Sequence, residues 1–353
     1  MRGFSRPVLM FVTAVLLTAG LAWFLLAGVK STAAASPGNY YRTPDGFSSA
    51  WKVLGKQGSN LGEFQQPRGV TGLADGSFVV VDRAARVQHI AEDGQPLGVF
   101  CMKDHDLGNP KGLCALPNGH LLICDTHYGR LMEMTVAGET IKVWGHNGFE
   151  PGCFTHPMSA ALDLTRNVVY IVNYGDYSDC VDKFTLDGEY VKRWGTFGSD
   201  PTQFQRPSGV AVDSEGSVYV ADSCNHRIGK FDPDGNLIKL FGEMGVAPGQ
   251  LRYPYDIARG PGDLLYVVEF NNHRVSVFDK DGNFVRVLGG PGTRSGEFQN
   301  PWSLTVDQRN RLIVSDTANF RVQILDLNGS GSSGEKQALT TDAQQVQKPR
   351  TFN

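Results

Sequence analysis

The sequence lacks the short motifs that mark several large enzyme classes. It contains no His-Glu-x-x-His metal motif, no Walker phosphate loop and no Gly-x-Ser-x-Gly nucleophile elbow, and its one Gly-x-Gly-x-x-Gly run, at 329–334, lies in a Gly/Ser-rich tail rather than between a strand and a helix as a dinucleotide motif does. Each of these motifs holds reactive groups at a fixed spacing, so a chain without them offers no sequence evidence for those reactions. The sequence therefore predicts no catalytic residue and no cofactor.

An excess of positive charge is also missing. The chain has 33 Lys and Arg residues against 36 Asp and Glu residues, which gives a formal net charge of −3 at pH 7. Proteins that bind nucleic acids gain much of their affinity from neutralising phosphates, and they need a basic surface to do so. The composition therefore speaks against a nucleic-acid partner.

Helical periodicity is missing from residue 47 onward, and one long apolar run stands out near the N-terminus. Residues 7–29 carry no charge and follow Arg2 and Arg6. At 1.5 Å per residue this run can cross a hydrocarbon core of about 30 Å. The basic residues before it predict that the N-terminus lies in the cytoplasm and the remainder outside.

This apolar run has two interpretations. As a retained signal anchor it makes the protein a single-pass protein of the cell membrane. As a cleaved signal peptide, with small residues at 33–35 before the cleavage site, it makes the protein periplasmic or secreted. Both interpretations place the rest of the chain outside the cytoplasm.

One pattern occurs six times in the chain. A large apolar residue precedes a proline by three positions, and successive prolines are 43 to 50 residues apart. The pairs are Phe64/Pro67, Leu107/Pro110, Phe154/Pro157, Phe204/Pro207, Leu251/Pro254 and Phe298/Pro301. A period of roughly 40–50 residues indicates stacked or radially repeated units.

Each unit contains four short runs with period-two alternation, separated by Gly, Asn and Asp. In the fourth unit the runs cover 209–212, 218–221, 227–231 and 237–242. This pattern predicts four antiparallel strands per unit, and six such units predict an all-β, six-bladed β-propeller. The sixth unit ends after its third run, near Gly329, and residues 50–55 match the missing fourth run. We therefore expect an N-terminal strand to complete the last blade.

The repeats resemble those of the NHL family. Its pattern of an acidic residue, then Asn-x-Arg and a β-branched residue, is matched at Asp222 to Arg227, Asn271 to Val275 and Asp316 to Val322. The resemblance covers residues 47–329, with the first three units degenerate. Propellers similar to NHL include RNA-binding and protein-interaction modules, peptide-amidating lyases and bacterial sensor domains, so the resemblance implies a fold rather than a function.

These features divide the chain into five parts. They are a cytoplasmic stub (1–6), the signal anchor or signal peptide (7–29), a linker (30–46), the propeller (47–329) and a tail rich in Gly, Ser, Gln and Thr (330–353). The tail has no apolar periodicity, which predicts disorder.

The residue after each repeated proline is predicted to line the mouth of the central channel, on the face that carries the longer loops. The six residues are Arg68, Lys111, Met158, Ser208, Tyr255 and Trp302. Two cations on adjacent blades are expected to face two aromatic residues across the axis, an arrangement that fits an anionic ligand with an apolar or ring-shaped body. In the alternative interpretation these side chains simply fill a solvated channel.

Metal ligands are scarce at this mouth. The resemblance to amidating lyases implies histidines after the blade prolines, and none is there, while Asp256 is the one charged oxygen ligand close by. His226 and His273 occupy equivalent positions of neighbouring units, where they form either a pH-sensitive rim or part of the repeat. Cys180 and Cys224 fall in corresponding loops and could form a disulfide, whereas Cys124 fits a small buried position. The sequence predicts no metal site.

Two functional hypotheses follow. In the favoured one, the chain is a non-catalytic, membrane-tethered binding or scaffold propeller outside the cytoplasm. Its partner would be a protein, peptide or anionic small molecule of the cell envelope. In the alternative, it is an extracytoplasmic lyase or hydrolase that uses the channel mouth.

Overall fold

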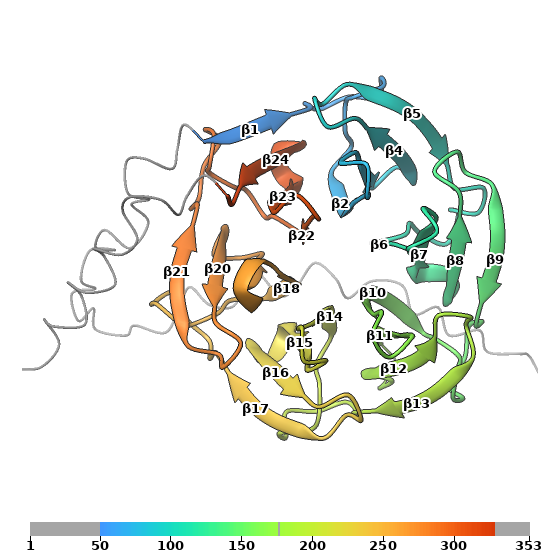
Figure 1. The fold of residues 1–353 in the computed structure, drawn as a ribbon, viewed down its shortest axis with the longest axis vertical. Helices are drawn as coiled ribbons and strands as arrows, with labels where there is room; N and C mark the ends of the chain where they lie inside the picture. Colours follow the sequence, from blue (N-terminus) through green and yellow to red (C-terminus); the bar gives the residue numbers. More distant parts are fainter. Residues whose placement is uncertain (1–49, 176, 329–353) are drawn as a thin grey trace, which may run out of the picture. The chain divides into compact units, whose positions relative to one another are not determined.

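The computed structural model describes residues 50–175 and 177–328, which form six four-stranded antiparallel sheets around a central axis (Figure 1). Strands β2, β6, β10, β14, β18 and β22 lie innermost, and each sheet runs outward from one of them (Figure 1). The predicted six-bladed propeller is therefore confirmed. The predicted stub, anchor, linker and tail all lie outside the described residues. Among those described, no helix is long and apolar enough to span a membrane.

The strands follow the repeat closely. Blade 1 contains β2 (Pro67–Gly72), β3 (Phe78–Asp82), β4 (Arg86–Ile90) and β5 (Pro96–Cys101), and blade 2 contains β6 (Gly112–Ala115), β7 (Leu121–Asp125), β8 (Arg130–Met134) and β9 (Thr140–Trp144). Blade 3 contains β10 (His156–Asp163), β11 (Val168–Tyr174), β12 (Cys180–Thr185) and β13 (Tyr190–Trp194), and blade 4 contains β14 (Pro207–Val212), β15 (Val218–Asp222), β16 (Arg227–Phe231) and β17 (Leu237–Phe241). Blade 5 contains β18 (Pro254–Arg259), β19 (Leu265–Glu269), β20 (Arg274–Phe278) and β21 (Phe284–Leu288). Blade 6 contains β22 (Leu304–Val306), β23 (Arg311–Asp316), β24 (Arg321–Asp326) and the N-terminal β1 (Trp51–Leu54).

The N-terminal strand closes the ring as predicted. Strand β1 pairs antiparallel with β24, with Trp51 opposite Leu325 and Leu54 opposite Val322. The Trp51 side chain is buried, and its ring meets that of Phe298 edge to face at a centroid distance of 5.3 Å. Residues from both ends of the propeller thus share one hydrophobic core.

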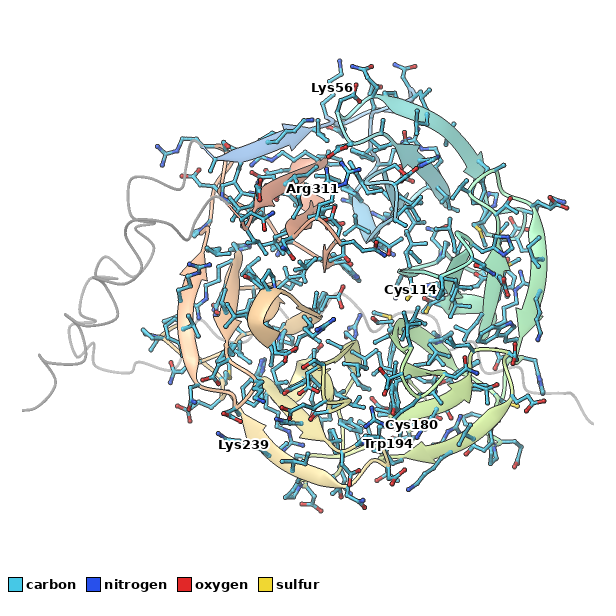
Figure 2. All side chains as sticks on the ribbon, in the orientation of Figure 1. Lys56, Cys114, Cys180, Trp194, Lys239 and Arg311 are labelled. Atoms are coloured by element: carbon cyan, nitrogen blue, oxygen red, sulfur yellow. The ribbon has the colours of Figure 1, made fainter. Side chains whose placement is uncertain are left out.

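The hydrophobic core is divided into six clusters, each filling the space between two neighbouring blades. Between blades 3 and 4, for example, Val172 and Phe204 pack with Val220 and Phe231. Figure 2 shows side chains filling the spaces between blades, with Lys56 and Lys239 at the outer rim and Cys114 close to the axis. Burial of these apolar faces between blades holds the ring together.

In blades 1, 4, 5 and 6 the acidic residue near the end of the second strand accepts a backbone N–H from the loop that enters the same blade. In blade 5 the Glu269 carboxylate accepts the Arg252 backbone N–H (2.9 Å) and the Arg274 Nε–H (2.6 Å). The fully buried Arg274 guanidinium also donates to the Val246 and Gln250 carbonyls. Charge-assisted bonds of this kind are stronger than neutral ones, and they fix the loop that leads to the channel mouth.

In blade 3 different residues hold the loop that enters the blade. Cys180 stands where the repeat has arginine, and Asn173 replaces the acid, accepting the His156 backbone N–H at 2.8 Å. Arg193 of β13 takes the place of the missing arginine. It pairs with the buried Asp182 (2.8 Å) and donates to the Cys153 carbonyl (2.6 Å), directly before Phe154. The degenerate repeat therefore keeps the loop anchored from the neighbouring strand.

The histidines and cysteines have structural positions. His226 Nδ1 accepts the Tyr253 backbone N–H (3.1 Å) and His273 Nδ1 accepts that of Asn300 (2.9 Å), so both histidines connect neighbouring blades. Over 50–175 and 177–328, no group of three or more His, Cys, Asp or Glu residues could hold a metal ion. Cys180 and Cys224 are free thiols and do not form the disulfide considered above. Cys124 is fully buried, as predicted.

Candidate functional site

The innermost strands of all six blades line a central cavity of about 270 Å³. Of the six residues predicted at the channel mouth, five line this cavity: Lys111, Met158, Ser208, Tyr255 and Trp302. The sixth, Arg68, lies over the Trp302 ring, 4.8 Å from its centroid. The structure thus brings these residues together around the central cavity.

A β-bulge aims the residue after the proline in four of the blades. The pairing register shifts between Pro67 and Gly69 in blade 1, which leaves Arg68 as the extra residue, and the same shift occurs around Met158, Ser208 and Tyr255. A bulge bends the strand and redirects the side chain of the extra residue. The recurrent proline and bulge are therefore the local reason that these positions face the mouth.

Three cations gather at the mouth, one more than predicted. Arg68 lies over Trp302, and Lys111 Nζ is 3.3 Å from the Tyr174 hydroxyl. The third is Arg206, whose guanidinium lies 5.3 Å and 5.8 Å from the ring centroids of Tyr174 and Tyr255. The Arg206 Nε is buried without a hydrogen-bond partner. Within the described residues none of the three cations pairs with a carboxylate.

Aromatic rings form the wall on which these cations lie. Tyr255 stacks on Phe270 at a centroid distance of 4.6 Å and meets Trp302 edge to face at 4.8 Å. On another side Tyr174 stacks on His156 at 5.0 Å. Cations over aromatic faces gain about 0.5–2 kcal/mol each, which lets the mouth hold positive charge without carboxylates.

Crowding of like charges is visible in the pKa values. Burial, followed by the charges of Arg68 and Arg206, lowers the pKa of Lys111 to about 7. Burial and the nearby Arg83 lower the pKa of Arg68 as well. Burial and Lys111 lower the pKa of His127 to about 4, so this neighbouring imidazole stays neutral. The buried Asp179 accepts the Arg206 backbone N–H at 2.5 Å and interacts with the Arg206 charge, but the mouth holds three cations and therefore carries an excess of positive charge that favours an anion.

Arg206, Tyr174 and Phe270 are not among the residues that the sequence predicts at the channel mouth, because each of those follows a repeated proline. Arg206 precedes Pro207, in a left-handed backbone conformation with φ of 55°. Tyr174 and Phe270 directly follow the acidic or amide residue that ends the second strand. In blades 2, 4 and 6 this position holds Thr126, Ser223 and Thr317, whose hydroxyls donate to the proline carbonyl of the next blade. A large residue in this position, where three other blades have Thr or Ser, was the sequence signal that could have predicted a side chain at the channel mouth.

The six residues predicted at the channel mouth differ from one another in burial and in the groups that they contact. Met158 is buried in the core between blades 3 and 4, and the Ser208 hydroxyl is bonded to the Arg206 carbonyl and to Ser223. The two predicted cations do not simply face the aromatic residues across the axis. Arg68 contacts Trp302 directly, because closure of the ring makes blades 6 and 1 neighbours.

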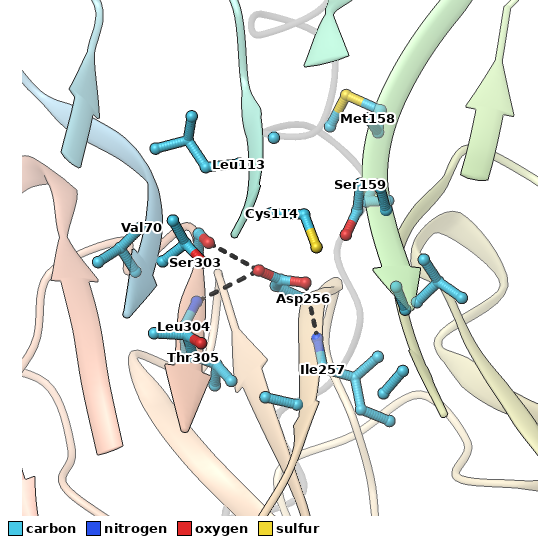
Figure 3. A pocket seen from close by; sticks show the side chains of 18 of the residues that line it. Val70, Leu113, Cys114, Met158, Ser159, Asp256, Ile257, Ser303, Leu304 and Thr305 are labelled. Carbon is cyan, nitrogen blue, oxygen red and sulfur yellow. Dashed lines mark hydrogen bonds between the residues drawn. The ribbon is translucent and has the colours of Figure 1, made fainter. Parts of the chain in front are cut away.

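Deeper in the cavity lies one carboxyl group, that of Asp256 (Figure 3). Its oxygens accept hydrogen bonds from the Ser303 hydroxyl (2.7 Å) and from the backbone N–H groups of Ile257 (2.9 Å) and Leu304 (3.3 Å). Burial raises the pKa of Asp256 to about 7. Cys114 and Ser159 point into the same space (Figure 3), so a single titratable acid occupies the interior below the cationic mouth.

Comparison with known proteins agrees with this architecture. Residues 204–231 match the NHL repeat, and residues 255–347 match a family described as a 6-bladed beta-propeller. No curated protein matches the chain.

Solved structures share the fold at low sequence identity. A putative gluconolactonase is 16% identical with a TM-score of 0.61, covering 80% of this chain and 93% of its own. A streptogramin B lyase is 15% identical with a TM-score of 0.57, covering 78% and 97%. A chain of a nidogen/laminin complex is 15% identical with a TM-score of 0.55, covering 72% and 96%. At these identities the likeness concerns the fold, which lyases, lactonases and binding propellers share. From its repeats and its closed ring, the chain is a member of the NHL-repeat six-bladed β-propeller family.

Proposed function

We propose that this protein is a non-catalytic binding propeller that captures an anionic ligand with an apolar or ring-shaped body at the channel mouth. One observation carries the proposal: Arg68, Lys111 and Arg206 converge on aromatic rings without a carboxylate partner in the described chain. Burying unpaired charge is costly, so proteins rarely assemble such a group unless a ligand completes it.

An anion at this position would compensate several costs together. It would accept charge-assisted hydrogen bonds from the two guanidinium groups and reduce the repulsion that lowers the pKa of Lys111. Its apolar part would lie against Tyr255 and Trp302, which are half-buried at the entrance. Clefts with a few polar groups on an aromatic wall are typical small-molecule or peptide sites.

We further propose that the propeller acts outside the cytoplasm, tethered to the membrane. The apolar segment 7–29 behind two arginines supports this location. The partner is then an anionic small molecule, a peptide or a protein of the cell envelope. The balanced net charge supports a partner other than nucleic acid.

The lyase or hydrolase alternative has one observation in its favour. The Asp256 carboxyl lies in the cavity with its pKa raised to about 7, which suits a general acid or base near neutral pH. Binding alone remains the better-supported function because Asp256 has no metal cluster or second carboxylate beside it among the described residues.

The test uses 8-anilinonaphthalene-1-sulfonate, an aromatic anion whose fluorescence rises on binding. We expect Arg206→Gln and Arg68→Gln each to weaken its affinity roughly tenfold, because a hydrogen bond to a charged group contributes about 1.5–3 kcal/mol. Arg294→Gln is the matched control, since that exposed arginine pairs with Glu297 away from the mouth. Equal affinity in all three variants would refute the proposal.

A further inference from the structure

We propose that the Lys111 amine is a nucleophile that forms an imine with an aldehyde or ketone bearing an anionic group, such as a 2-oxo acid or a phosphorylated aldehyde. This inference rests on the proposed anion site, which would hold the charged end of such a compound. It adds a covalent step to ligand capture and names the chemical class of the ligand.

The position of Lys111 fits this role. Lys111 is 7% exposed and lines the central cavity, so the part of the residue that stays accessible faces the space where a ligand would lie. Its Nζ lies 5.6 Å and 6.0 Å from the ring centroids of Tyr174 and Trp302. Within residues 50–175 and 177–328, its one polar side-chain contact is the Tyr174 hydroxyl at 3.3 Å. Nothing in this contact requires the amine to stay charged.

Besides burial, the two charges that shift the pKa of Lys111 are both positive, although the carboxyl group of Asp256 lines the same cavity and that of Asp179 lies near Arg206. Arg68 lies on β2 of blade 1, and Arg206 precedes β14 of blade 4. Burial lowers the pKa of Lys111 most, and the charges of these two arginines lower it further. His127 follows β7 and has a pKa lowered to about 4, while burial raises the pKa of Tyr174. Near pH 7 about a thousandfold more of this lysine is free amine than of an ordinary lysine, whose pKa is about 10.4. Desolvation beside other cations is a recognised means of activating a lysine nucleophile.

Lys230 shows that burial alone does not create this environment. It is 8% exposed and lies over the Tyr219 ring, as Lys111 lies over Tyr174. Its Nζ, however, donates to the Lys280 carbonyl at 2.9 Å, and it does not line the central cavity. Lys230 is therefore an internal control in the same protein.

The reaction balances without any further reagent. The lone pair of Lys111 Nζ attacks the carbonyl carbon, and the carbonyl oxygen takes the proton of the Tyr174 hydroxyl. The nitrogen, now positively charged, gives one of its own protons to the tyrosinate, and a neutral carbinolamine results. In the second step Tyr174 protonates the carbinol oxygen, the nitrogen lone pair expels water, and the nitrogen proton again restores Tyr174. One amine and one carbonyl give one imine and one water, with no change in oxidation state. The raised pKa of Tyr174 keeps the phenol protonated for this task.

The experiment traps the imine in the wild-type protein. Pyridoxal 5′-phosphate is incubated with the protein, sodium borohydride reduces the imine, and peptide mass spectrometry locates the label. We expect Lys111 to be labelled at least tenfold faster than Lys230 or any surface lysine. The Lys111 rate should rise to a plateau just above pH 7, whereas the surface rate should continue to rise towards pH 10. Tyr174→Phe should slow labelling of Lys111 without moving the plateau, and Lys230→Arg should leave it unchanged.

The outcomes separate this inference from the proposed function. Pyridoxal without its phosphate should label Lys111 at least tenfold more slowly, because it lacks the group held by Arg68 and Arg206. Label spread over surface lysines, while the mouth still binds 8-anilinonaphthalene-1-sulfonate, would overturn the imine and leave anion binding intact. Equal labelling of Lys111 by the two aldehydes would keep the nucleophile and refute the anion site.

Discussion

Replacement of Trp51 by alanine should destabilise the propeller far more than replacement of its neighbour Val53. Trp51 is 6% exposed and packs on Phe298 in the core that joins both ends of the ring, whereas Val53 is 38% exposed on the same strand. Truncating a buried aromatic residue to alanine costs about 3–5 kcal/mol, and a half-exposed valine costs roughly 1 kcal/mol or less.

The assay is thermal unfolding followed by circular dichroism. For a domain of this size each kcal/mol shifts the Tm by roughly 2–4 °C, so Trp51→Ala should lower it by about 6–20 °C and Val53→Ala by a few degrees at most. Both variants retain the backbone hydrogen bonds of β1 to β24, so the difference reports the side-chain contact alone. Equal shifts, or a shift below about 3 °C for Trp51→Ala, would show that β1 does not close the ring as described.

Three further results are expected. The folded pKa of Asp256 is raised to about 7, so the folded state binds more protons than the unfolded chain between about pH 4 and 7, and stability should fall as pH rises through this window. Asp256→Asn should remove that part of the slope in denaturant titrations, and an unchanged slope would contradict the assignment. A bound anion should raise the pKa of Lys111, so 8-anilinonaphthalene-1-sulfonate should bind with proton uptake and more weakly at pH 9 than at pH 6. Calorimetry in two buffers of different ionisation enthalpy measures this uptake, and its absence would place the probe elsewhere. Arg193→Ala should destabilise the protein by about 3–5 kcal/mol, as should Arg227→Ala, because each change leaves a buried carboxylate unpaired. A loss below about 1 kcal/mol for Arg193→Ala in urea unfolding would refute the view that Arg193 takes the place of the repeat's arginine in blade 3.

The architecture was predictable because the period of the repeat gives the number of blades and the residue pattern within it gives the strands. Six blades follow from the spacing of the prolines and from the turn residues. The closing role of β1 follows because the sixth repeat lacks a fourth strand of its own. In blades 4 and 5 the acidic residue before the loop pairs with the arginine five residues later, as at Asp222 and Glu269, and both residues belong to the pattern that repeats in the sequence.

The parts that escaped prediction depend on contacts between blades or between strands. Arg193 replaces a missing arginine because the β12–β13 register sets it opposite Asp182, and register is not visible in a single run of residues. Arg206 reaches the mouth from the position before the proline, where the backbone turns into the left-handed region. Tyr174 joins the site because its blade lacks the small hydroxyl residue that other blades use at that position.

Other predictions from the sequence stay predictions. The anchor at 7–29 and the tail at 330–353 lie outside the described residues. The distinction between a retained anchor and a cleaved signal peptide can be made by N-terminal sequencing of the mature protein: residues beginning near Ser36 would support cleavage, and an intact N-terminus would support the anchor.

The claim that the channel mouth is an anion site can be tested most directly by locating an anion there. Crystals of the propeller soaked with 4-bromobenzenesulfonate would reveal the bromine by its anomalous signal. The account predicts one dominant peak at the mouth, with the sulfonate between Arg68, Lys111 and Arg206 and the ring against Tyr255 or Trp302. Peaks confined to the outer surface, with the mouth unoccupied at saturating probe, would contradict it.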